Sequence, residues 1–208
     1  MQHYTTALVL DQTDLKARGN RCAAALMLKR YSAVVDDAKV ILAAEPKNAR
    51  ACARLSKGCL GTGDIPAAVR WATEATKLDC NNAQYRTEEI RVKGVASELK
   101  AAHAHLSAGN AAAAAVSARR ALSLAGDVPL VDAAVVLARA LLQQGKGTEA
   151  VQASRGAVQA DGSSTAALFV HADALVATGA TSSAHHRANV SACVCPALHT
   201  NLLMLGCH

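Results

Sequence analysis

The stretch Asn20–Leu60, NRCAAALMLKRYSAVVDDAKVILAAEPKNARACARLSKGCL, decides the fold of this chain. Its apolar residues recur at helical spacing, and Lys29-Arg30-Tyr31 interrupts them, so the stretch predicts helices joined by a tight turn. Pro46 ends the second of these helices, because proline cannot continue a helix. Alternation of the kind that strands show is absent from the chain, and we expect an all-α protein.

The same kind of turn recurs along the chain. Equivalent turns fall at Gly63, Gly109, Gly145 and Gly179, and the steps from Lys29 to Gly63 and from Gly145 to Gly179 are each 34 residues. A helix–turn–helix period of about 34 residues is typical of the tetratricopeptide repeat. We therefore predict an α-solenoid of tetratricopeptide repeats, in which each repeat is buried mainly by its neighbours.

The turns also divide the chain into units. Residues 1–14 are expected to form the second helix of an incomplete repeat, and residues 15–82 two complete repeats. Residues 83–94 carry many charges at helical spacing and are expected to form a solvated helical extension. Two further repeats and a partial one are expected over residues 95–180, and an irregular tail without an amphipathic period over residues 181–208.

The composition restricts the partners and the compartment. Apolar residues make up 51% of the chain but aromatic residues only 2%, which predicts a thin core made by close approach of helices. The net charge of +6 comes from scattered residues with few aromatic groups for base stacking, so no nucleic-acid partner is expected. No apolar run is long enough to cross a membrane. Seven cysteines without a secretory signal favour reduced thiols and a cytoplasmic location.

No enzyme motif and no strong metal motif is present. The chain has no phosphate-binding loop, no nucleophile elbow and no H-E-x-x-H, so we expect no catalytic activity and no cofactor. Packing is the expected role of four cysteines, Cys22, Cys52, Cys59 and Cys80. The cysteines and histidines of the tail have irregular spacing that does not predict a metal site. His103 and His105 need no catalytic role.

One set of polar residues predicts a binding site. Arg50, Arg54 and Lys57 share one face of a first helix, and Asn20 stands on the first helix of the preceding repeat. In a solenoid such helices lie side by side, so an amide would meet two guanidinium groups. This donor set suits a carboxylate, because arginine binds carboxylates in a bidentate manner. The alternative is that these side chains form only a solvated helix face.

The same stretch resembles the clamp-type tetratricopeptide modules of heat-shock co-chaperones. That family carries N-R-A-A, followed one repeat later by basic residues four apart; Asn20-Arg21 matches the first motif, and Arg50 with Arg54 the second. The order of units and the charged insert further resemble the co-chaperones that end in a J domain. The resemblance implies that Asn20, Arg50 and Arg54, assisted by Lys57, hold the carboxylates of a cytosolic chaperone tail ending in E-E-V-D.

The chain also departs from this family. The family clamp uses a lysine and an asparagine from a first helix that would precede Tyr4, and no His-Pro-Asp motif is present. The alternative function is therefore a generic scaffold that binds other protein partners and keeps a vestigial clamp. Solenoid ends without a polar cap leave apolar surface uncovered, which favours self-association.

Overall fold

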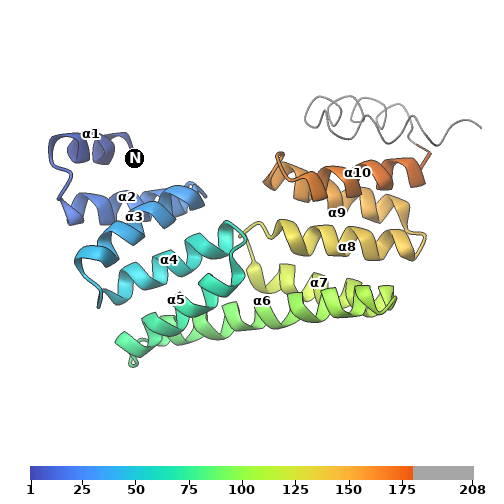
Figure 1. The fold of residues 1–208 in the computed structure, drawn as a ribbon, viewed down its shortest axis with the longest axis horizontal. Helices are drawn as coiled ribbons and strands as arrows, with labels where there is room; N and C mark the ends of the chain where they lie inside the picture. The colour runs from blue at the N-terminus through green and yellow to red at the C-terminus, as the bar shows by residue number, and fades with distance from the viewer. Residues whose placement is uncertain (180–208) are drawn as a thin grey trace, which may run out of the picture.

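Ten α-helices follow one another along residues 1–179, the part of the chain that this computed structural model describes (Figure 1). Their bounds are α1 Gln2–Leu10, α2 Leu15–Met27, α3 Tyr31–Ala44, α4 Ala49–Gly61, α5 Ile65–Leu78, α6 Ala83–Ser107, α7 Ala111–Ala125, α8 Val131–Gln143, α9 Gly147–Ala160 and α10 Thr165–Ala177. Each helix packs mainly against its neighbours in the sequence. The described part contains no strand, so the prediction of an all-α solenoid is confirmed.

The turns inside the helix pairs have the predicted positions. Lys29, Gly63, Gly109, Gly145 and Gly179 all have positive φ, between 56° and 84°. In the first four of these turns, the amide after the turn residue donates to the carbonyl five residues earlier at 2.9 Å. This hydrogen bond satisfies a free carbonyl at the end of the first helix. Lys29 is the only residue other than glycine with positive φ among residues 1–179.

Short polar side chains start six of the helices. Their oxygens accept hydrogen bonds from free amides of the first turn. Each such cap stabilises its helix by about 1 kcal/mol. The capping residues are Asp14, Asn48, Asp64, Asn82, Asn110 and Ser164. The carboxylate of Asp64, for example, accepts from the amide of Ala67 at 3.0 Å.

Helix α6 differs from the others because it is 25 residues long. It packs against both α5 and α7, so it links the two halves of the stack (Figure 1). The expected extension over residues 83–94 is the first part of this helix. It is solvated on only one side, since Val92 is fully buried and Arg91 donates to the carbonyls of Leu124 and Ala125 at 2.9 and 3.1 Å. This contact with the end of α7 corrects the expectation of a solvated segment.

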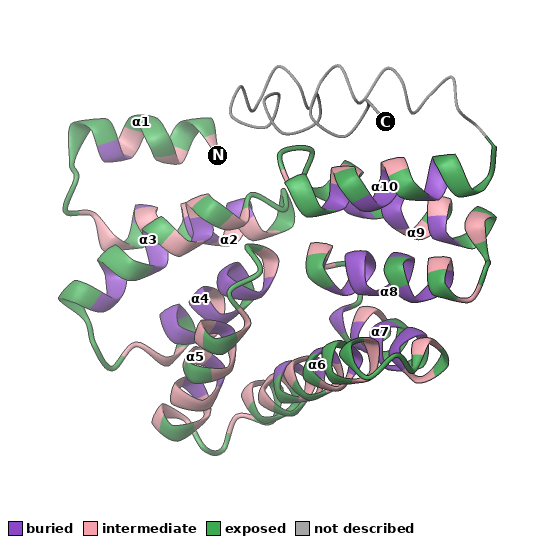
Figure 2. Ribbon diagram, turned by 45° about the vertical axis from the view of Figure 1, so that its right-hand side comes forward, coloured by how far each residue is buried: buried purple, intermediate pink, exposed green. Residues whose placement is uncertain are grey.

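Buried residues line the faces where neighbouring helices meet (Figure 2). In helices α2–α5 this core includes large aliphatic side chains, such as Val34, Ile41, Leu55 and Leu60. In helices α6–α9 most of the buried residues are alanines. Within residues 1–179, no helix combines the length and the apolar character that a bilayer crossing demands. The expected irregular tail, with its cysteines and histidines, lies outside the described residues.

Candidate functional site

The first helices of the two complete repeats, α2 and α4, lie side by side and form a cavity of about 370 Å³. Asn20 on α2 and both Arg50 and Arg54 on α4 line this cavity. The structure therefore brings together three of the four residues that the sequence singled out. Lys57 is exposed and is not among the described residues that line the cavity.

Arg54 is held in place by the neighbouring helix. Its Nη1 donates to the carbonyl of Gly19 at 2.9 Å, and the residue is half-buried. A Cβ at Gly19 would lie 3.4 Å from the same Nη1, which is an ordinary van der Waals contact. The bond uses one of the five N–H donors of the guanidinium group, and it limits how far the others can move.

The cavity has an excess of positive charge. Lys16, Arg50 and Arg54 line it together with one carboxylate, that of Glu45. Glu45 accepts a hydrogen bond from the Nδ2 of Asn48 at 2.7 Å. Sequence reasoning did not single out Lys16. Its spacing could have done so, because it lies one helical turn before Asn20 and therefore on the same face of α2.

The arginine of the N-R motif has a different role from the asparagine. Arg21 donates from Nε and Nη2 to the carboxylate of Asp37 on α3, at 2.9 and 2.7 Å, and Arg18 reaches the same carboxylate at 3.3 Å. Asp37 is only 1% exposed. The hydrogen bond to Asp37 raises the pKa of Arg21. This ion network ties α2 to α3, and it thereby supports the wall of the cavity that carries Asn20.

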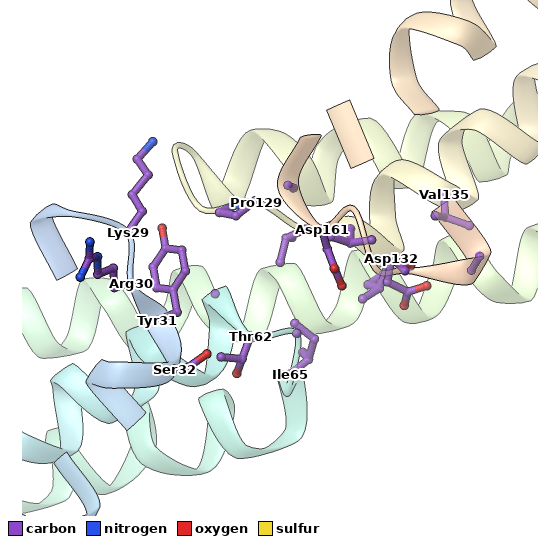
Figure 3. A pocket seen from close by; sticks show the side chains of 18 of the residues that line it. Lys29, Arg30, Tyr31, Ser32, Thr62, Ile65, Pro129, Asp132, Val135 and Asp161 are labelled. Carbon is purple, nitrogen blue, oxygen red and sulfur yellow. The ribbon is translucent and has the colours of Figure 1, made fainter. Parts of the chain in front are cut away.

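A second, larger hollow of about 800 Å³ lies between the two halves of the stack (Figure 3). The turns that follow α2 and α4 form one wall, and the segments that lead into α8 and α10 form the other. Lys29 and Arg30 lie on the first wall, and Asp132 and Asp161 on the second (Figure 3). The Nζ of Lys29 donates to the carbonyl of Asp127 at 3.3 Å, which connects the halves. The sequence did not predict this hollow.

Three of the four cysteines in residues 1–179 are buried, as expected, and Cys80 is exposed. The prediction of a packing role is wrong for Cys80, because it lies in the loop after α5. Burial raises the pKa of Cys22 to about 11 and also raises the pKa values of Cys52 and Cys59. These three thiols therefore stay protonated near neutral pH, and the thiolate is the reactive form.

Ser154 and His171 form a pair that sequence reasoning missed. The Oγ of Ser154 lies 2.8 Å from the Nδ1 of His171 and 2.7 Å from the carbonyl oxygen of Ala150. A serine next to a histidine can be a nucleophile and its base. Here both residues are buried, so the pair links α9 to α10 rather than facing a substrate. Among residues 1–179, no cluster of histidine, cysteine or acidic residues could hold a metal ion.

Comparison with known proteins identifies the fold. No protein-family model matches the chain. The chain is similar to the crystal structure of the TPR domain of P58(IPK), with a TM-score of 0.73 and 17% sequence identity over 96% of its length. It spans 57% of that domain.

More distant similarity is found to the TPR2AB domain of yeast Sti1 in complex with pHSP90, with a TM-score of 0.43 and 14% identity, over 89% of this chain and 79% of that one. A thermophilic TPR protein of Thermus thermophilus, TTC0263, matches with a TM-score of 0.38 and 19% identity, over 83% of this chain and 87% of that one. The similarity to the P58(IPK) domain, together with the ten stacked helices of residues 1–179, shows that this chain has the α-solenoid fold of tetratricopeptide-repeat domains.

Proposed function

We propose that the protein is a non-catalytic adaptor that binds acidic C-terminal peptides of cytosolic heat-shock chaperones through a partial carboxylate clamp. One observation carries this proposal: Asn20 and Arg54 are 34 residues apart in the sequence and line the same cavity, together with Arg50. The resemblance to clamp-type co-chaperone modules supports the choice of peptide. A partner of this kind also places the protein in the cytoplasm.

Each residue has a defined part in the clamp. The exposed guanidinium of Arg50 and the amide of Asn20 donate to a terminal or side-chain carboxylate. Arg54 adds donors from a guanidinium that Gly19 already orients, so less side-chain entropy is lost on binding. Lys16 and Lys57 contribute positive charge. Glu45 opposes binding because its carboxylate lines the same cavity.

Fluorescence anisotropy of a labelled peptide ending in E-E-V-D tests the clamp. We expect micromolar binding by the wild-type protein, and a loss of affinity of roughly tenfold or more in Arg54→Glu and in Arg50→Glu. Arg50→Glu separates binding from folding, because Arg50 is exposed and does not make the bond to Gly19. Glu45→Gln should bind more tightly.

The control is Arg155→Glu, which makes the same charge change at an exposed position of α9. It should bind like the wild type. Affinity should also fall as salt rises, since salt screens the attraction between solvent-exposed charges of the cavity and the acidic peptide. The clamp is rejected if the wild-type protein does not bind the peptide, or if binding is insensitive to salt and to both cavity variants.

The alternative function is a generic scaffold with a vestigial clamp, and the hollow between the two halves favours it. This hollow has about twice the volume of the clamp cavity, and it offers cations on one wall and carboxylates on the other. Its partner would be a protein segment that carries both charges. A partner retained by Arg54→Glu but lost in Ala166→Arg, a change in the lining of the hollow, would support the scaffold over the clamp.

A further inference from the structure

The turn after α2 carries a lysine where the equivalent turns carry glycine. Lys29 has a φ of 56°, and the turn residues Gly63, Gly109, Gly145 and Gly179 have φ between 72° and 84°. The Cβ of lysine makes this left-handed conformation less stable than it is for glycine. Strained residues of this kind cluster at binding sites, where the strain accompanies a function. The side chain of Lys29 is therefore the feature of this turn that needs a functional explanation.

Lys29 and Arg30 give the first wall of the hollow its positive charge (Figure 3). Both residues are exposed, and the part of the chain that the structure describes contains no ion pair of either one. The bond from the Nζ of Lys29 to the carbonyl oxygen of Asp127 is long, at 3.3 Å. A buried cation such as Arg21, by contrast, already holds a carboxylate. The two cations of the wall can therefore donate to a carboxylate that comes from another molecule.

Asp132 and Asp161 give the opposite wall its negative charge (Figure 3). Asp161 accepts hydrogen bonds from the hydroxyl and the amide of Ser163 at 2.6 and 2.9 Å, and these bonds lower the pKa of Asp161. The side chain of Asp132 is 59% exposed, and its Oδ2 lies 2.9 Å from the Nε2 of His103. Within residues 1–179 no ion pair joins this wall to the first one, so the hollow separates two walls of opposite charge.

The lining between the two walls is mainly apolar. It includes Tyr31 and Ile65 from the first half, and Leu99 and Leu130 from the second. A Cβ at Gly61 would overlap the ring of Tyr31, so glycine is what lets this ring pack against α4. Burial raises the pKa of Tyr31, and its hydroxyl is therefore a protonated donor near neutral pH. The hollow thus offers apolar contact between two charged ends.

These features decide which kind of partner fits the hollow. A nucleic acid is disfavoured, because Asp132 and Asp161 would repel its phosphates. The volume of about 800 Å³ lies in the range of about 300–1,000 Å³ that protein pockets offer to compact ligands, so it holds a short segment of chain rather than a folded domain. The opposite charges of the walls match a segment that carries an acidic and a basic residue with an apolar stretch between them.

We propose that the hollow binds an extended protein segment whose acidic residue meets Lys29 and Arg30 and whose basic residue meets the carboxylates of the opposite wall. On binding, Lys29 gives up its bond to Asp127 and donates to the carboxylate of the segment, because a bond between two charged groups is shorter and stronger than a bond to a neutral carbonyl. The proposal rests on the alternative function, in which the hollow takes a protein partner, and it does not depend on the clamp. It adds the direction of the bound segment and the residue that recognises its acidic end.

A library of random short peptides displayed on phage supplies the probe. The immobilised bait is the full chain with Arg50→Glu, which disables the clamp at an exposed residue, so that clamp ligands are not retained. The most enriched peptide is then synthesised with a fluorescent label and titrated by anisotropy. We expect it to carry an acidic and a basic residue, and to bind about fivefold more weakly when the bait also carries Lys29→Gly, the size expected for one exposed ion pair.

Lys29→Gly separates binding from folding. Glycine relieves the turn, so a loss of affinity with an equal or higher melting temperature does not come from unfolding. The matched control is Lys47→Gly, the same change at an exposed turn residue that is not in the described lining of the hollow, and it should leave affinity unchanged.

A double-mutant cycle assigns each end of the peptide to a wall. Replacing the acidic residue of the peptide by glutamine should weaken binding about fivefold on the bait, and less than about twofold when Lys29→Gly is present. Replacing the basic residue by glutamine should show the same dependence on Asp132→Asn.

The proposal is overturned if no enriched peptide loses affinity in Lys29→Gly, if Lys47→Gly weakens binding as much, or if the enriched peptides carry charges of one sign only. The clamp is judged separately by the peptide ending in E-E-V-D, which should bind Lys29→Gly as tightly as the wild type. A wild-type protein that fails to bind this peptide would reject the clamp and leave the proposal for the hollow standing.

Discussion

The two halves of the stack, α2–α5 and α6–α9, have the same helix–turn–helix geometry but differ in the polar groups that they bury. The first half buries large aliphatic residues and an ion network around Asp37. The second half also buries large aliphatic residues, such as Val95, Val136 and Leu141, but its second helices α7 and α9 bury only alanine and serine. Its ion pairs between helices, such as Arg119 with Glu149, are exposed.

This difference shows that the same pairing of helices accepts a buried ion network between α2 and α3, and only alanine and serine at the buried positions of α7 and α9. The first half also carries polar groups between α2 and α4, and these line the cavity of Asn20 and Arg54. The candidate site thus lies in the half that buries the ion network.

The largest loss of stability is expected from Asp37→Ala, which removes the buried partner of two arginines. Arg18 and Arg21 would be left without their carboxylate, at side-chain exposures of 14% and 22%, and we expect a loss of about 3 kcal/mol of stability. Urea unfolding followed by circular dichroism measures this loss. Asp36→Ala, at the neighbouring position outside the core, is the control and should change little. Equal midpoints for the two variants would show that the network contributes nothing to the first half.

A smaller effect is expected from Ala118→Leu in the second half. Ala118 is fully buried, so the added atoms force α7 away from its neighbours at a cost of about 1–3 kcal/mol. The control is Ala112→Leu on the exposed side of the same helix. Thermal unfolding of the two variants should separate them clearly. If Ala118→Leu were as stable as the control, close approach of helices would not be what stabilises this half.

The turns offer a comparison in which two substitutions should change the stability of the protein in opposite directions. Lys29→Gly should stabilise the turn by up to about 1 kcal/mol, because glycine adopts positive φ without the cost that a Cβ brings, and this gain should exceed the loss of the long, exposed hydrogen bond to Asp127. Gly145→Lys in the second half should have the opposite effect. Nothing lies within 4 Å of a Cβ at Gly145, so the cost would come from the backbone alone. Melting temperatures that move in the same direction for both variants would contradict this reasoning.

The smallest effect concerns the thiols, which in the described residues occur only in the first half. Iodoacetamide near neutral pH should modify Cys80 rapidly and leave Cys22, Cys52 and Cys59 until the half unfolds, as peptide mapping can show. Stability should also fall with rising pH. The folded state keeps Cys22 protonated up to a pKa of about 11, whereas an unfolded thiol ionises near 9.0.

Ionisation of the unfolded state therefore favours unfolding between these two values. The melting temperature should be lower at about pH 10 than near pH 8, and Cys22→Ala should reduce the difference. A thiol at Cys22 that reacts as fast as Cys80 in the folded protein would show that the first half opens readily.

Several features of this protein could be predicted from the sequence because they depend on local rules. Four of the five turn positions follow from glycines, which tolerate positive φ, and the helix starts follow from capping groups such as Asp64. The pairing of Asn20 with Arg50 and Arg54 follows from the repeat period, because equivalent residues of neighbouring first helices lie side by side. These relations need only the helical period and the repeat length.

Other features were decided only by the tertiary structure. The bond from Arg54 to Gly19, the use of Arg21 by Asp37 and the exposure of Cys80 depend on how far each helix is rotated against its neighbour. The hollow beside Lys29 depends on where the long helix α6 places the second half. The sequence does not reveal these contacts by spacing alone, because a small rotation of one helix exchanges the side chain that faces a partner for the one that faces water.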